Sequence, residues 1–216
     1  MEKSEGAGPV KKLVLIGAGG HAKSCIDVIE TQGIYQIIGF LDLPEKDCTR
    51  LLDYPKLGSD DLIPELAKDQ NHFFLVAVGQ ILSPENRTRI YGMIKKAGGQ
   101  LATVLSPLAH ISKHAKIGEG TVVMHHAMVN ANVDIGVNCI INSKALIEHD
   151  CVVKDFCHVS TGALVNGNVI IHPGTFIGSG AVLSNGLEIK EFSVVHLGAI
   201  VKSRSDCVIT KTHAEL

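Results

Sequence analysis

The stretch CIINSKALIEHDCVVKDFCHV, residues 139–159, has an aliphatic residue at every sixth position, and this spacing continues far on both sides. From 105 to 201 each sixth residue is Leu, Ile or Val, and the residue two positions earlier is mostly small. A period of six is typical of a hexapeptide repeat, in which one hexad makes a short strand and a turn. Three hexads make one triangular coil, and each coil buries its apolar side against its neighbours. The apolar spacing of a helix is absent.

The composition sets bounds on the class of protein. A chain of 216 residues has room for one large domain or two modest ones. The formal net charge is −2 and there is no basic run, so we expect neither nucleic acid nor an anionic membrane as a partner. Residues 1–10 are polar and Gly-rich, which predicts a flexible tail rather than a signal peptide. No segment is apolar for the roughly 18 residues of a membrane helix, so we expect a cytoplasmic protein.

The six cysteines fit a reducing compartment better than disulfides or zinc. Cys139, Cys151 and Cys157 occupy small-residue positions of the repeat, where Cys behaves as a compact hydrophobic residue. No CxxC pair occurs, and Cys25 and Cys48 are isolated. We therefore expect no structural metal and no disulfide.

Residues 11–103 alternate between apolar runs and helical patterns, which predicts a small parallel α/β domain ahead of the repeats at 104–216. We expect strands at 12–16, 35–42 and 73–79, helices at 22–31, 61–69 and 85–97, and a link at 101–107. Ligands of such sheets bind at the carboxyl ends of the strands. Three of these ends carry candidates, namely the loop 17–21, Asp42 and Gly79.

The loop Gly17-Ala-Gly-Gly-His-Ala22 nearly matches the dinucleotide pattern GxGxxG/A. Three strands make only half of a dinucleotide fold, so a mononucleotide, such as that of a sugar nucleotide, is favoured over NAD. Backbone N–H groups of such a loop bind phosphate at a helix N-terminus. Alternatively, the glycines serve only a tight strand–helix turn. We expect His21 to reach toward a ligand from within this loop.

Histidines interrupt the repeat, and His149 is the strongest candidate among them because acids flank it on both sides. A His between two carboxylates suits general-base work near neutral pH. It would equally suit a corner exposed to solvent. The paired His125 and His126 are expected to be structural, with a supporting role at a subunit interface as the alternative. A zinc site of the carbonic anhydrase kind is disfavoured, because no two histidines lie five residues apart.

Several motifs, in the same order along residues 11–203, resemble those of the PglD/NeuD family of bacterial sugar acyltransferases. They are Ile16-Gly-Ala-Gly-Gly-His-Ala22, Phe40-Leu-Asp42, Val76-Ala-Val-Gly79, Ile141–Cys151 and Phe156-Cys-His-Val-Ser160. The resemblance implies a Rossmann-like nucleotide-binding unit followed by a left-handed parallel β-helix, assembled as a homotrimer with active sites between adjacent helices. It implies an acetyl-CoA-dependent transferase acting on the C4 amine of a UDP-linked 4-amino-4,6-dideoxy sugar, with no metal.

The resemblance also implies roles for single residues. His149 matches the general base and Asp150 the adjacent acid. Residues that match contacts to the coenzyme are His158, Gly167, Ser179 and Leu197. Residues that match contacts to the nucleotide sugar are Gly19, Gly20, His21, Asp42 and Gly79, and Leu43 stands where the family often has a second acid. Leu197 stands where relatives often have Gly, and the common C-terminal Gly-Val-Pro-Ala-like segment is missing.

These residues predict direct acetyl transfer in a ternary complex. His149 would deprotonate the amine, Asp150 would stabilise the imidazolium, and a backbone N–H such as that of Gly167 would stabilise the oxyanion. No covalent intermediate is expected, because no Cys or Ser stands with a His in a nucleophile arrangement. Two alternatives stay open, namely O-acetylation of a sialic-type sugar and a binding protein of the same fold without catalysis.

Overall fold

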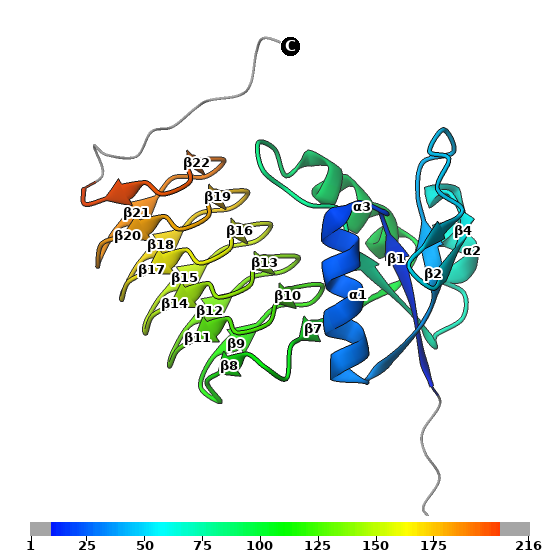
Figure 1. The fold of residues 1–216 in the computed structure, drawn as a ribbon, viewed down its shortest axis with the longest axis horizontal. Coiled ribbons are helices and arrows are strands. Elements are labelled where there is room, and N and C mark those ends of the chain that lie inside the picture. Colours follow the sequence, from blue (N-terminus) through cyan, green and yellow to red (C-terminus); the bar gives the residue numbers. More distant parts are fainter. Residues whose placement is uncertain (1–9, 204–216) are drawn as a thin grey trace, which may run out of the picture.

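The structure, a computed structural model, describes residues 10–203, which form an α/β layer followed by a β-solenoid (Figure 1). Most of the predicted tail, 1–10, and the chain end, 204–216, lie outside the described residues. No helix in the described part is long and apolar enough to cross a membrane.

The α/β layer has a sheet in the order β3-β4-β2-β1-β5-β6. Its centre is β1 (Lys11–Ile16), which runs parallel to β2 (Tyr35–Leu41) and β5 (His72–Val76). The remaining elements are α1 (Gly20–Gln32), β3 (Arg50–Leu51), β4 (Tyr54–Gly58), the 3-10 turn η1 (Asp60–Leu62), α2 (Ile63–Leu66), α3 (Glu85–Lys96) and β6 (Gln100–Leu101). The apolar β1 is completely covered from Leu13 onward, as expected for a central parallel strand.

The sequence prediction was wrong in several details of this layer. It missed β3 and β6, because two-residue strands carry almost no periodic signal, and β4, because a Pro at position 55 argues against a strand in the sequence. It also placed His21 in the loop, whereas α1 begins at Gly20 and His21 lies in its first turn. The expected helix at 61–69 is only one turn of 3-10 helix and the short α2.

The repeats form a left-handed parallel β-helix of two-residue strands, which lie on three faces within the described residues. The first face holds β7 (Val104–Leu105), β10 (Val122–Val123), β13 (Ile140–Ile141), β16 (His158–Val159), β19 (Phe176–Ile177) and β22 (Val194–Val195). The second face holds β8 (His110–Ile111), β11 (Met128–Val129), β14 (Leu146–Ile147), β17 (Leu164–Val165), β20 (Val182–Leu183) and β23 (Ile200–Val201). The third face holds β9 (Lys116–Ile117), β12 (Asp134–Ile135), β15 (Val152–Val153), β18 (Ile170–Ile171) and β21 (Glu188–Ile189).

The two residue series predicted from the sequence form the interior of this solenoid. The aliphatic series is buried from Val123 to Val201, and the small residues between them pack in the same cluster. Each corner turns through a residue with positive φ, at every sixth position from Gly120 to Gly198. The corners that lead from the first face to the second are named the 1–2 corners. Those from the second face to the third are the 2–3 corners, and those from the third face back to the first are the 3–1 corners.

The α/β layer packs against the first face of the solenoid, and helix α1 lies beside β7 in Figure 1. Val104, Val122 and Met124 of that face share one apolar cluster with Cys25 and Ile26 of α1. The predicted link at 101–107 contains regular structure, namely the last residue of β6 and the whole of β7. The result is one continuous packing surface between the two parts.

Candidate active site

His149 and Asp150 lie in a 2–3 corner, directly after β14. Asp150 is the positive-φ residue of the corner, with φ of 62°, a conformation that Asp tolerates better than most residues. Its Oδ2 lies 2.8 Å from His149 Nδ1. The carboxylate therefore favours the tautomer with the proton on Nδ1, which leaves the lone pair on Nε2.

The coil below holds Asp150 in place. Asn132, the equivalent corner residue 18 positions earlier, donates from Nδ2 to Asp150 Oδ1 at 2.8 Å. The bonds from Asn132 and His149 lower the pKa of Asp150 below its usual value, so it is a carboxylate at neutral pH. Glu148, the other acid beside His149, is instead held by Asn130 Nδ2 at 2.8 Å. Of the two flanking acids, only Asp150 contacts the imidazole.

The coil above leaves room for the imidazole. A Cβ at Gly167 would lie 2.8 Å from His149 Cε1 and 2.9 Å from Nε2, so the ring lies directly over this glycine. Within residues 10–203, His149 Nε2 and the N–H of Gly167 have no hydrogen-bond partner. A free proton acceptor and a free backbone donor thus lie in the same corner.

His158 is buried at the start of β16 on the first face. Its Nδ1 donates to the carbonyl oxygen of Gln80 at 2.6 Å, and Asn142 Nδ2 donates to its Nε2 at 3.2 Å. Burial lowers its pKa to about 4; the bond to Gln80 opposes this shift and the nearby Arg87 adds to it. His158 is therefore neutral near pH 7.

His21 and Gly79 lie next to each other at the sheet edge that faces the solenoid. A Cβ at Gly79 would lie 3.7 Å from His21 Cβ. Burial, followed by repulsion from the Arg87 charge and, once it is protonated, from His158, lowers the pKa of His21 to about 3. Gln80, which follows Gly79 in the short loop after β5, accepts the hydrogen bond of His158. This loop therefore places Gly79, a predicted nucleotide-sugar residue, near His158, a predicted coenzyme residue.

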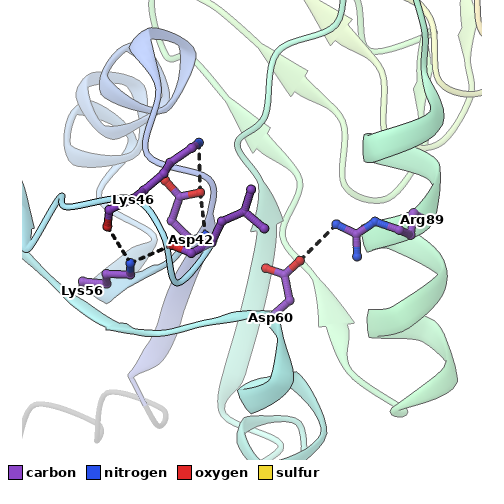
Figure 2. A network of polar contacts seen from close by, with 6 residues as sticks. Asp42, Lys46, Lys56, Asp60 and Arg89 are labelled. Carbon is purple, nitrogen blue, oxygen red and sulfur yellow. Dashed lines mark hydrogen bonds and ion pairs between the residues drawn. The ribbon is translucent and has the colours of Figure 1, made fainter.

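A cavity of about 160 Å³ lies at the carboxyl ends of β1, β2 and β5. Its lining includes Ile16, Gly17, Asp42, Leu43, Lys46, Asp60, Val78, Asn86, Arg89 and Ile90. Figure 2 shows its charged side chains, with Lys46 directed at Asp42 on one side and Arg89 paired with Asp60 on the other. This is the edge at which parallel sheets bind ligands.

Asp42 has a polar atom without a partner in this cavity. Its Oδ1 accepts the N–H of Leu43 at 2.9 Å and Lys46 Nζ at 3.2 Å. Its Oδ2 is buried and has no hydrogen bond among the described residues. A buried carboxylate oxygen without a donor is costly, so a ligand that offers an N–H or O–H suits this position.

The glycines Gly19 and Gly20 at the start of α1 are not required by packing. A Cβ at either position would meet open space, and Gly19 has an ordinary φ of −82°. Gly17 is different, because its φ is +105° and a Cβ there would clash with Val78. Gly17 therefore makes the turn, while the next two glycines keep the helix N-terminus accessible to an anion.

The predicted coenzyme residues are not brought together within one chain. Gly167 lies beside His149 in the 2–3 corners, whereas Ser179 and Leu197 stack in the 1–2 corners, at the other edge of the second face. Ser179 Oγ bonds Ser160 Oγ at 2.9 Å, and Leu197 is 80% exposed. His158 belongs to the same side as Ser179. The second face therefore separates the two groups of residues.

Sequence reasoning missed several polar residues of both regions. Lys46, Asp60 and Arg89 line the cavity, and Gln80 holds His158. A single basic or amide residue in a loop has no sequence signal of its own, so these residues became visible only through contacts. Among the described residues, no group of three or more His, Cys, Asp or Glu side chains could hold a metal ion.

Comparison with known proteins finds similar proteins for both parts of the chain. Residues 12–94 match the PglD N-terminal domain family. The acetyltransferase domain of PglB from Neisseria gonorrhoeae FA1090 is 29% identical, with a TM-score of 0.81 over 93% of this chain and 94% of that one. The chain therefore resembles PglD-type acetyltransferases over both of its parts.

Further solved structures extend the likeness. The same PglB domain has been solved in complex with acetyl coenzyme A, and it is 28% identical over 91% of this chain and 95% of that one, with a TM-score of 0.81. WeeI from Acinetobacter baumannii AYE is 27% identical over 88% and 91% of the two chains, with a TM-score of 0.78. Perosamine N-acetyltransferase from Caulobacter crescentus, at 24% identity and a TM-score of 0.65 over 94% and 98%, shares the fold.

Proposed function

We propose that this acetyltransferase transfers the acetyl group of acetyl-CoA to the C4 amine of a UDP-linked 4-amino-4,6-dideoxy sugar in a ternary complex. The observation that carries the proposal is the pair His149–Asp150, which leaves His149 Nε2 free beside the N–H of Gly167. The acetyl-CoA complex of the PglB domain, at 28% identity, supports the choice of donor. The free thiols among the described cysteines fit the reducing cytoplasm.

In the proposed reaction, His149 Nε2 accepts a proton from the amine while the nitrogen attacks the thioester carbonyl. Asp150 stabilises the imidazolium through Nδ1–H, at the observed distance of 2.8 Å. The N–H of Gly167 donates to the oxyanion of the tetrahedral intermediate. Collapse of this intermediate forms the amide and breaks the C–S bond, and His149 returns the proton to the departing thiolate of CoA.

The acceptor is assigned from the cavity in the α/β layer. Asp42 Oδ2 suits an N–H or O–H of a nucleobase or ribose, and uracil offers one such N–H. Lys46 and Arg89 supply positive charge near a diphosphate, and the open N-terminus of α1 at Gly20 supplies backbone N–H groups. His158 is assigned to the coenzyme, with Ser179 and Leu197 along its path.

We further propose a homotrimer in which two copies complete each site. The second face has a row of exposed apolar side chains, with Met128 at 40%, Leu164 at 38% and Ile200 at 62% exposure. Such a row favours association. Because this face separates the His149 corner from the His158 side, a second copy packed on it would bring His149 of one chain toward His158 of the other.

Release of free CoA thiol is the direct test of the activity. Acetyl-CoA is offered with UDP-, GDP- and dTDP-linked 4-amino sugars and with free sialic-type sugars. We expect turnover with an amino sugar nucleotide, lost in His149→Ala and kept in His114→Ala. His114 is a matched control, because it lies exposed in a 2–3 corner two coils earlier and its side chain has no hydrogen bond within residues 10–203. Near-normal turnover by His149→Ala would refute the mechanism.

Other outcomes of the same panel distinguish the alternatives. Turnover only with a sialic-type sugar would assign the protein to O-acetylation. No thiol release with any acceptor, together with no binding of acetyl-CoA, would favour a binding protein of the same fold without catalysis.

The shared site has its own test, in which His149→Ala and His158→Asn chains are co-expressed. Random mixing should give about a quarter of the subunit interfaces an intact pair of histidines, and so partial recovery of activity. No recovery in proven mixed trimers would refute a site built from two copies.

A further inference from the structure

The loop that carries the pocket residues leaves β2 as a tight turn. Leu43, Pro44, Glu45 and Lys46 form it, and the N–H of Lys46 donates to the carbonyl of Leu43 at 3.1 Å. Pro at the second position favours such a turn. Leu43 and Lys46, its first and last residues, line the cavity beside Asp42. The conformation of this turn therefore sets the shape of one pocket wall.

Lys56, on the neighbouring strand β4, fastens this turn from outside the cavity. Its Nζ donates to the carbonyl oxygen of Leu43 at 2.8 Å and to that of Lys46 at 3.0 Å (Figure 2). One ammonium group thus joins both ends of the turn. Lys56 itself is anchored, since its backbone N–H donates to Thr49 at 2.9 Å and its Cα pairs with Phe40 of β2.

The ammonium group of Lys56 makes no other polar contact among the described residues. No carboxylate within residues 10–203 forms an ion pair with it, and it is not among the pocket-lining residues. An ammonium group that binds only two carbonyl oxygens acts on backbone conformation. The effect reaches Asp42, because Lys46 must stay in place to occupy Asp42 Oδ1 and leave Oδ2 for a ligand.

We propose that Lys56 is a positioning residue for nucleotide binding, which holds the turn 43–46 in the shape that presents Asp42, Leu43 and Lys46 to a nucleoside diphosphate. This proposal rests on the proposed function. It assigns Lys56 no contact with the ligand and no part in acetyl transfer, which occurs at the solenoid corner.

The test compares Lys56→Met with wild type and with Lys68→Met. Met keeps most of the stem and removes the donors. Lys68 is an exposed lysine of the same layer, and its side chain forms no hydrogen bond or ion pair within residues 10–203. The probe is UDP, with GDP as a second probe, and the readouts are the calorimetric Kd, the KM of each substrate, kcat and the melting temperature.

We expect Lys56→Met to raise the Kd of UDP and the KM of the nucleotide sugar about tenfold, the effect of one charge-assisted hydrogen bond. The KM of acetyl-CoA and kcat should stay within about twofold, because the solenoid corner is untouched. Lys56→Arg should recover most of the affinity, since a guanidinium can also donate to both carbonyls. Lys68→Met should behave like wild type.

The two proposals fail in different ways. A wild-type protein that binds neither UDP nor GDP would overturn the nucleotide assignment itself. Wild-type binding of UDP that is unchanged in Lys56→Met would overturn the role of Lys56 alone. If Lys56→Met lowers the melting temperature and kcat and raises the Kd of UDP and the KM of both substrates together, its effect is general destabilisation and the proposal fails.

Discussion

Replacing Gly167 by Ala tests whether the position of His149 matters for the reaction. The φ of Gly167 is not left-handed, so Ala fits the local backbone without strain. Its new methyl group would instead lie 2.8 Å from His149 Cε1 and 2.9 Å from Nε2. Ordinary contact begins at 3.4 Å, so the imidazole must move by at least 0.6 Å, or Gly167 must move away from it.

The size of the effect follows from the exposure of the ring. The His149 side chain is 60% exposed, so it can move outward at little cost, and we expect a change of less than about 1 kcal/mol in the free energy of unfolding. Catalysis is more sensitive, because a displacement on the order of 1 Å can reduce the rate about 100-fold. The backbone N–H survives in Ala, so the proposed oxyanion donor is kept. We therefore expect kcat to fall by roughly 10- to 100-fold.

The assay is steady-state thiol release at saturating acetyl-CoA and acceptor, with urea unfolding of the same preparations. Gly92→Ala is the control, because Gly92 lies within α3, a Cβ there meets open space, and Ala favours the helix. It should keep wild-type kcat and unfold at a slightly higher urea concentration. A Gly167→Ala protein with wild-type kcat would show that the ring position is not what limits the reaction, and the argument from close approach would fail.

Three further predictions follow from the contacts of the site. Asp150→Asn, which tolerates the left-handed corner, should lower kcat about 100-fold at unchanged stability, measured by thiol release and thermal melting. Arg87→Met should lower the free energy of unfolding in urea by about 3–5 kcal/mol, because four hydrogen bonds to Val76, Val78 and Asn138 are lost and their acceptors are left without a donor. A loss below 1 kcal/mol would contradict it. The depressed pKa of His158, about 4, means that the unfolded chain binds a proton that the native protein does not. Stability should therefore fall as the pH drops from about 6.5 toward 4, and His158→Asn should flatten this slope in urea midpoints measured across the window.

The solenoid was predictable because its signal is repeated at every coil. Seventeen aliphatic positions with one period leave no competing pattern, and their burial in the structure follows directly. The N-terminal layer was less predictable, because β3 and β6 are two residues long and are formed only by their neighbours in the sheet. Local sequence has no means of specifying such strands.

The separation of His149 and His158 could have been predicted from the period of the repeat. The two residues are nine positions apart, which is half of an 18-residue coil, so they must lie on different sides of the solenoid. The contacts of Gln80 and Arg87 are of another kind. Those across the junction of the two parts join residues 51 to 94 positions apart and depend on how the layer packs against the first face. No periodic argument reaches such contacts.

The candidate acetyl-transfer corner owes its geometry to the register of the coils. Equivalent residues of successive coils lie about 4.8 Å apart, the spacing of hydrogen-bonded strands. Asn132 is thereby placed to hold Asp150, and Gly167 lies against the His149 ring. The imidazole fits in this position because the next coil has a glycine, Gly167, where a Cβ would clash with the ring. The proposed base, His149, therefore projects from a corner fixed by paired strands, and its bond to Asp150 orients the ring before a substrate arrives.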